Sequence, residues 1–472
     1  MLLAAGGLIV SASTLVGIVI IAAPIIAAPT VVAPLDQLAG WLLLVGAAAG
    51  VTFTINAFAP ARRSGWAVIP SFLLSMFATE LAAFHLVWQA IVVAALVAVG
   101  ALASWAGWLG LALAGLSWLG LVVLVVQGYR ARTPITAAVA GLTGKPPSFA
   151  IPWRRLLNPF PLRLDHKRIA RNVEYLRVDG RRLLLDVYFP PHRVQRRPAI
   201  IQVHGGGWVL GDKRDQGVPI LTHLSDRGFV GFNVNYRLSP AATFPAHLVD
   251  IKRAIAWVRE HCDEYGVDPR FVAVTGGSAG AHLAAMAALT VGVARFQPGF
   301  EDTDTSVQAA IPLYGVYDLT NRSHRQLSGF LEKLIEPLVI KAFFAEEPEK
   351  FIDASPLAHV HADAPPFFVI HGSQDTMAPL ADAREFVAAL KKVSAAPVLF
   401  AEIAGAHHAF DVFVSPRSLP VIVGVGDFLE HLYAEFVRVH GPAAQVAGVV
   451  VRPAENRASP VADGPPAAAI TP

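Results

Sequence analysis

Charge is distributed very unevenly along this chain. Residues 1–129 contain only four charged side chains, whereas all the others among the 38 basic and 35 acidic residues follow them. A soluble domain carries about 25% charged residues, and this chain carries 15%. We therefore predict an apolar N-terminal part, residues 1–128, that crosses a membrane, and a water-soluble part after it.

Four apolar runs in the N-terminal part are long enough to span a bilayer: Leu8–Ala28, Leu38–Phe58, Trp66–Trp88 and Ala90–Gln127. Lipid offers no water to an exposed backbone, so such runs cross as helices of about 20 residues. We expect about four spans, with three or five as alternatives. A cleaved signal peptide is the alternative for the first run, but it would begin with basic residues, and none precedes Leu8.

Basic residues beside the spans predict the side on which the soluble part lies. Arg62 and Arg63 follow the second run, and Arg130, Arg132 and Lys145 follow the last. Because basic flanks stay in the cytoplasm, four spans place the soluble part there. If residues 66–127 form three helices, the soluble part lies outside instead. We expect an integral protein of the plasma membrane with a cytoplasmic soluble part.

Two ionisable residues, Glu80 and His85, lie within the third run. Ionisable groups at membrane depth are candidates for a function. The alternative, which we favour, is a tilted or half-interfacial helix whose Glu80 and His85 face a neighbouring helix. Gly110 and Ala114 form a small-xxx-small pair that would let two helices approach closely.

Composition excludes several classes of protein. A single cysteine, Cys262, excludes a disulfide scaffold and a zinc ribbon. A net charge of +3 gives no reason to expect nucleic acid as a partner. The spacing of His359, His361 and Asp363 could mimic metal ligands, but no second cluster completes a site, so we predict no metal and no cofactor.

The sequence after the last span divides into three segments. Residues 129–165 are predicted to be a juxtamembrane linker, because Pro146-Pro147 breaks any helix. Residues 166–441 form a folded domain, and residues 442–472 a disordered tail rich in Ala, Pro and Val. The domain begins with a hairpin, indicated by Asp179-Gly180. Apolar strands then alternate with helices, which predicts an α/β fold: a mostly parallel sheet with helices on both faces, preceded by all-α transmembrane helices.

The strands expected in this domain are Val173–Val178, Leu183–Phe189, Ala199–Val203, Val230–Val234, Val272–Thr275, Ala309–Leu313, Phe367–Ile370 and Val398–Ile403. The expected helices are His247–Cys262, Ala279–Leu289, Leu380–Val393 and Val421–Val439.

A G-x-S-x-G motif, Gly276 to Gly280, lies directly between a strand and a helix. A sharp strand-to-helix turn of this kind exposes the serine hydroxyl at the carboxyl edge of the sheet, so Ser278 is the candidate nucleophile. A glycine-rich helix start without chemistry is the alternative.

A second glycine motif, His204-Gly205-Gly206-Gly207-Trp208, ends the strand Ala199–Val203. A tetrahedral intermediate carries an oxyanion that needs fixed N–H donors, and glycines let the backbone approach it. We predict an oxyanion hole from the amides of Gly205, Gly206 and Ala279. His204 is expected to anchor the loop; activation of the serine is its alternative role.

The segment 204–208 resembles the HGGGW motif of the hormone-sensitive-lipase-like group of α/β-hydrolases. The segment 235–245, with Tyr236-Arg237-Leu238-Ser239-Pro240 and Phe244-Pro245, resembles that group's YRLAP…FP stretch. The resemblance covers roughly residues 170–440 and implies an esterase or lipase. Gly277 stands where the group often has Asp, and Gly276–Ala284 also resembles formamidase-like relatives.

The order of the triad in this family is serine, acid, histidine. Asp375 follows the strand Phe367–Ile370 and is the candidate acid, although an aspartate in a polar turn is the alternative. The resemblance to the family's H-x-F pattern makes His408 the base, with His407 as the alternative. His282 is expected to pack beside the serine.

These observations predict a membrane-anchored serine carboxylesterase or lipase that works through an acyl-enzyme. The alternatives are an acyltransferase or amidase with the same triad, and an inactive scaffold. Expected partners are a lipophilic ester substrate and membrane lipids. The segment Asp318–Phe344 is expected to form either a cap over an acyl pocket or an ordinary covering helix.

Overall fold

The structure is a computed structural model that describes residues 34–62, 67–149, 156–160, 168–192, 196–321, 329 and 331–444. The first expected span, Leu8–Ala28, lies outside the described residues, as does the expected tail after residue 444. We call residues 34–130 the helical part and residues 131–444 the α/β part.

One eight-stranded sheet forms the centre of the α/β part, in the order β1-β2-β4-β3-β5-β6-β7-β8. The first pairs, β1 with β2 and β2 with β4, are antiparallel, and the remaining pairs are parallel. Asp179 and Gly180 join β1 to β2, and both have the positive φ that a type I′ turn requires. The fold class predicted above is confirmed. The strands are β1 Ile169–Val178, β2 Arg181–Tyr188, β3 Arg197–Val203, β4 Val230–Val234, β5 Val267–Gly277, β6 Ala309–Leu313, β7 Phe367–Gly372 and β8 Val398–Ile403.

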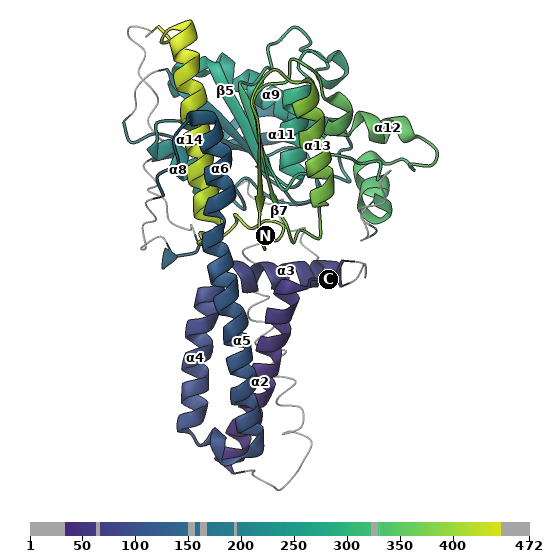
Figure 1. Ribbon diagram of the computed structural model, residues 1–472. Helices are drawn as coiled ribbons and strands as arrows, with labels where there is room; N and C mark the ends of the chain where they lie inside the picture. The colour runs from purple at the N-terminus through teal and green to yellow at the C-terminus, as the bar shows by residue number, and fades with distance from the viewer. Residues whose placement is uncertain are drawn as a thin grey trace, which may run out of the picture.

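Helices cover both faces of this sheet, and each face buries its own apolar cluster (Figure 1). One face carries α9, α11 and α13, and the other carries α6, α8 and α14. The helices are α6 Arg132–Thr143, α8 Val218–Asp226, α9 Ala246–Glu260, α10 Cys262–Tyr265, α11 Ala279–Leu289, α12 Pro348–Asp353, α13 Leu380–Val393 and α14 Ser418–His440. Short 3₁₀ turns lie at Ala294–Phe296 and Pro356–His359, and a π-helix, η4, at Leu331–Ile340.

The prediction of a linker over residues 129–165 is wrong for its first part. Helix α6 follows α5 with only Ala131 between them, and both belong to one apolar stretch of 39 residues. Ile135 and Val139, one turn apart, are fully buried. The methyl group of Ile135 fits against Gly424 of α14, where a Cβ would approach within 2.2 Å. The packing of Ile135 and Val139 stabilises α6 as far as its C-cap, Gly144, which lies two residues before Pro146.

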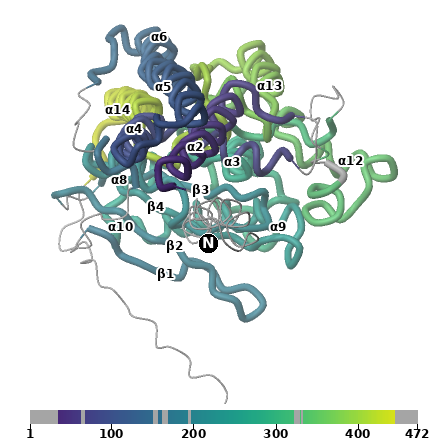
Figure 2. Tube along the Cα trace, turned by 90° about the horizontal axis from the view of Figure 1, so that it is seen from below, coloured from purple at the N-terminus to yellow at the C-terminus, as the bar shows by residue number. Residues whose placement is uncertain are grey.

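The helical part consists of α2 Leu35–Phe58, α3 Val68–Glu80, α4 Ala82–Ala98, a 3₁₀ turn at Ala101–Ala103, and α5 Trp105–Arg130. Helices α2, α4 and α5 run side by side away from the α/β part, and α3 lies across their upper end (Figure 1). In the view from below, the helices α2 to α5 overlap the side of the α/β part that is farther from β1 (Figure 2).

Two of these helices are long and apolar enough to cross a membrane, or three if α3 and α4 are counted as one broken span. The expected single helix Trp66–Trp88 is wrong, because the chain bends by 84° between α3 and α4. The expected run Ala90–Gln127 is also divided, by Gly100 with positive φ and by Ser104, whose hydroxyl caps α5. The expected close approach at Gly110 is confirmed, since a Cβ there would lie 2.7 Å from the amide nitrogen of Leu44.

Candidate active site

Ser278 lies on the sharp turn between β5 and α11, as the G-x-S-x-G motif predicts. Its φ of 57° and ψ of −120° are outside the helical region, and its amide donates to the carbonyl of Leu313 at 3.0 Å. The flanking glycines make this turn possible. A Cβ on Gly276 would lie 2.5 Å from the carbonyl carbon of Gly280, and one on Gly280 would lie 2.1 Å from the carbonyl oxygen of Val203.

The structure brings Ser278, His408 and Asp375 together in one hydrogen-bonded chain. The hydroxyl of Ser278 lies 2.7 Å from Nε2 of His408, and Nδ1 of His408 lies 2.7 Å from Oδ2 of Asp375. Because a carboxylate only accepts, His408 donates from Nδ1, which leaves Nε2 to accept the proton of the serine hydroxyl. The sequence-predicted nucleophile, base and acid are therefore in contact.

Asp375 is held in place and kept ionised by its surroundings. Its Oδ1 accepts from the amides of Met377 and Ala378, both at 2.8 Å. Burial alone would raise the pKa of this carboxyl, but the charge of His408 and hydrogen bonds from His371 and His408 outweigh it and hold the pKa well below its usual value. The carboxylate can therefore stabilise a positive charge on His408.

The other candidate histidines have different partners. His407 points away from Ser278 and donates from Nε2 to the carbonyl of Ala57 in α2, at 2.9 Å. His204 donates to the carbonyl of Gly205 at 2.7 Å and stacks on Tyr236, so it anchors its loop, as expected. His282, in the first turn of α11, donates to the carbonyl of Ala354 at 2.7 Å.

The expected oxyanion hole needs one correction. The amide of Gly205 donates to Oε1 of Gln216 at 2.8 Å and is therefore not free to bind an oxyanion. The amides of Gly206, Gly207 and Ala279 have no acceptor among the described residues. The sequence offered three equivalent glycines, and the choice between them depends on Gln216, which only the fold brings to this loop.

Gly277, the departure from the family's usual Asp, is explained by Tyr314. A Cβ at position 277 would lie 2.3 Å from the hydroxyl of Tyr314. That hydroxyl donates to the carboxylate of Asp411, and the ring contacts His408 with a centroid distance of 4.8 Å. The tyrosine therefore takes the space of a side chain at 277. Neither Tyr314 nor Asp411 is recognisable as a site residue from local sequence.

The helical part also contacts the site, which the sequence did not indicate. Phe72 of α3 packs edge-on against His408, with centroids 5.8 Å apart. The guanidinium of Arg62 donates to Gln374, the neighbour of Asp375, at 2.6 Å. Glu80, at the end of α3, forms a buried ion pair with Arg417 at 2.7 Å. Glu80 thus pairs with the α/β part and not with a neighbouring span, whereas His85 accepts from Trp88 of its own helix at 3.0 Å.

The segment 318–344 lies beside the glycine loop. In η4, Ile335 and Val339 are buried in the apolar core, and Leu334 would lie 3.1 Å from a Cβ on Gly207. The helix therefore covers one flank of the oxyanion loop. His359 donates to the carbonyl of Asp353 at 2.8 Å, and no three ligand-type side chains in the described part of the chain are grouped to hold a metal ion.

A serine on a strained strand-to-helix turn, hydrogen bonded through a histidine to a carboxylate on a mostly parallel sheet, defines a serine hydrolase of the α/β-hydrolase fold. The comparisons agree. The BD-FAE family model matches residues 185–390. A probable carboxylic ester hydrolase of Mycobacterium tuberculosis, LipM, is 39% identical over 417 residues, which cover 83% of this chain and 93% of LipM.

Two further relatives from Mycobacterium tuberculosis are esterases. LipC is 37% identical over 66% of this chain and 77% of its own length, and LipQ is 48% identical over 54% of this chain and 60% of its own length. The chain belongs to this family of carboxylic ester hydrolases, and it is an ester-hydrolysing enzyme.

Proposed function

We propose that this chain is a membrane-anchored serine esterase that cleaves lipophilic esters at the surface of the bilayer. The observation that carries the chemistry is the hydrogen-bonded chain from Ser278 through His408 to Asp375, at 2.7 Å for each step. The observation that supports the location is the packing of α3 directly on that chain.

Four groups divide the reaction between them. His408 accepts the proton of Ser278 through Nε2 while the serine oxygen attacks the ester carbonyl. The amides of Gly206, Gly207 and Ala279 stabilise the oxyanion. His408 then returns its proton to the leaving alcohol, and the acyl-enzyme is cleared by water in the reverse sequence. Asp375 orients the imidazole and stabilises its charge throughout.

The membrane placement rests on the composition and arrangement of the helical part. Trp88, Val122 and Leu119 expose 50%, 49% and 68% of their surface on α4 and α5, which is expected of side chains that face lipid. The match to LipM covers 83% of this chain, more than residues 166–472 can supply, so similarity extends into the helical part.

The basic residues support a cytoplasmic α/β part. Arg62 contacts the α/β part through Gln374, and Arg130 and Arg132 lie at the junction of α5 and α6. Both clusters therefore lie at the same end of the helical part, and that end stays in the cytoplasm by the positive-inside rule.

The full chain in detergent micelles, assayed with p-nitrophenyl esters of increasing acyl length, tests this proposal. We expect kcat/KM to rise with acyl length, and Ser278→Ala to lose about three orders of magnitude or more in kcat. Ser148→Ala, which changes an exposed serine outside the site, is the matched control. Hydrolysis that survives in Ser278→Ala would overturn the chemistry, and a preference for acetate esters would overturn the lipophilic substrate.

A further inference from the structure

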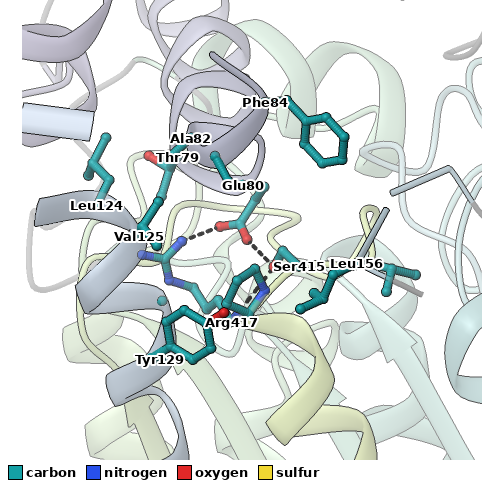
Figure 3. Close-up of a pocket in the computed structure, with 14 residues that line it drawn as sticks. Thr79, Glu80, Ala82, Phe84, Leu124, Val125, Tyr129, Leu156, Ser415 and Arg417 are labelled. Atoms are coloured by element: carbon teal, nitrogen blue, oxygen red, sulfur yellow. Dashed lines mark hydrogen bonds and ion pairs between the residues drawn. The ribbon is translucent and has the colours of Figure 1, made fainter. Parts of the chain in front are cut away.

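A pocket lies where the helical part meets the α/β part (Figure 3). It is formed by the adjoining ends of α3 and α4, by α5, and by the loop Val414–Arg417, and it has a cavity volume of about 90 Å³. None of the groups used in the reaction lines it.

Arg417 is one of the polar residues that line this pocket, and only one of its three guanidinium nitrogens has a partner among the described residues. Its side chain is 1% exposed, and Nη1 donates to Glu80 at 2.7 Å. Nε and Nη2 have no partner among the described residues. These two atoms form the edge of the guanidinium with two parallel N–H groups, which matches a carboxylate or phosphate. Buried donors without acceptors are costly and rare, so this edge indicates a missing acceptor.

Glu80 does not compete for that edge. Its Oε1 accepts from Nη1 of Arg417, and its Oε2 accepts from the hydroxyl of Ser415 at 2.6 Å. Glu80 therefore fixes the orientation of the guanidinium. Thr79, beside it, adds a buried hydroxyl without a partner among the described residues.

The remaining walls are apolar and lead outward to the surface of the helices. Leu124 and Val125 of α5, Leu156 and Phe84 line the pocket. Phe84 and Tyr129, at its edge, expose 36% and 43% of their surface. A ligand that fits has an acceptor head for Arg417 and an apolar chain along α4 and α5.

We propose that this pocket binds the anionic head of an amphiphile, either the carboxylate of a fatty acid or the phosphate of an acidic phospholipid, drawn from the membrane. The proposal rests on the membrane placement proposed above, but not on the chemistry of Ser278. A fatty acid is also the acid product of an esterase that acts on lipophilic esters, so the pocket would be exposed to it. Because Arg417 and His408 belong to one loop, a bound amphiphile would tie that loop to the bilayer.

The test is equilibrium binding to the full chain in neutral detergent, with radiolabelled oleate, dioleoyl phosphatidic acid and oleyl alcohol as probes. All variants carry Ser278→Ala, so that no acyl-enzyme contributes. We expect one saturable site for oleate, for phosphatidic acid or for both, which identifies the source of the anion. Oleyl alcohol, with the same chain and no charge, should bind at least about tenfold more weakly.

Two variants locate the site and one serves as control. Arg417→Lys keeps the charge and its pairing with Glu80 but removes the two parallel donors, and should weaken binding of the anions by about tenfold or more. Ala83→Trp should block the pocket from the lipid side while leaving Arg417 intact, and so answers the question if Arg417→Lys does not fold. Arg130→Gln changes an exposed arginine nearby and should have no effect.

Equal affinity for oleyl alcohol, unchanged binding in both pocket variants, or the absence of a saturable site would overturn the proposal. Ester hydrolysis by the same chains with Ser278 restored is measured in parallel. If the chain with an intact pocket binds no anion but still hydrolyses esters through Ser278, only the pocket proposal is rejected. Hydrolysis that does not depend on Ser278 rejects the proposed chemistry instead.

Discussion

The ring of Phe72 lies edge-on against the imidazole of His408, with centroids 5.8 Å apart and planes at 77°. Phe72 belongs to α3 in the apolar helical part, and His408 to the loop after β8 in the α/β part. The base of the triad is thus packed against the helix that lies between α2 and α4, so the helical part forms a wall of the reaction site.

Replacing Phe72 with alanine should impair catalysis without disrupting the rest of the helical part. An edge-on aromatic pair is worth about 0.5–1.5 kcal/mol, so kcat/KM for long-chain p-nitrophenyl esters should fall by about two- to tenfold. Phe53→Ala, on α2 with 38% of its surface exposed, is the control and should behave as the wild type. Equal rates for Phe72→Ala and Phe53→Ala would show that α3 plays no part in the reaction site.

The Glu80–Arg417 pair should stabilise the junction between the two parts. Glu80→Gln leaves the Arg417 guanidinium buried without its counter-charge, which costs about 3–5 kcal/mol. The temperature of unfolding in detergent should drop clearly. Glu435→Gln breaks an exposed pair with Arg438, whose side chains are 47% and 70% exposed, and should cost less than about 1 kcal/mol. Similar shifts for both variants would contradict a structural role for the buried pair.

Gly277→Asp introduces the residue that the hormone-sensitive-lipase-like group often has at this position. In this chain it should lower the stability of the fold. The new side chain would meet the hydroxyl of Tyr314, which lies 2.3 Å from the position of a Cβ, and overpacking of this kind costs about 1–3 kcal/mol. Adding Tyr314→Ala makes room, so the double variant should recover part of the thermal stability that Gly277→Asp loses. A Gly277→Asp protein as stable as the wild type would show that Tyr314 moves aside freely.

The free energy of unfolding should decrease as the pH is lowered into the acid range, because buried histidines must stay neutral in the folded chain. Burial is the main reason that the pKa of His282 is lowered from 6.5 to about 4. Between these values the unfolded chain binds the extra proton, so stability is complete above pH 6.5 and is lost as the pH falls toward 4.

The loss contributed by one such histidine is up to about 1.4 kcal/mol per pH unit. His282→Gln should therefore reduce the acid-side slope of the unfolding free energy, measured at several pH values in detergent. His192→Gln, at an exposed position, should leave the slope unchanged. A slope that is the same in all three proteins would mean that His282 is already neutral in the unfolded chain or charged in the folded one.

The α/β fold could be predicted because its signals are local. Each parallel strand is a short apolar run, and Asp179-Gly180 has the residue types that a tight hairpin needs. The sequence pattern also predicts both ends of α13, Leu380–Val393, as the structure has them. Ser278 was recognisable because its turn requires Gly276 and Gly280 on either side. Asp375 and His408 followed from family order rather than from geometry, and they are the residues that the structure joins.

What could not be predicted depends on contacts between distant segments. Apolar periodicity does not reveal that the chain bends at Leu81, because the residue that draws α3 over the site, Glu80, has its partner Arg417 in the α/β part. The roles of Gly205 and Gly277 also depend on residues that are distant in the sequence. The amide of Gly205 donates to Gln216, and Tyr314 fills the space beside Gly277.

Labelling with a fluorophosphonate tests the central claim most directly, since the probe reacts with an activated serine. The full chain in detergent should gain one adduct, and peptide mass spectrometry should place it on Ser278. Ser278→Ala should gain none, and His408→Ala should label far more slowly because the serine keeps its proton. An adduct on another serine, or a wild-type enzyme that hydrolyses esters but is never labelled, would contradict the account.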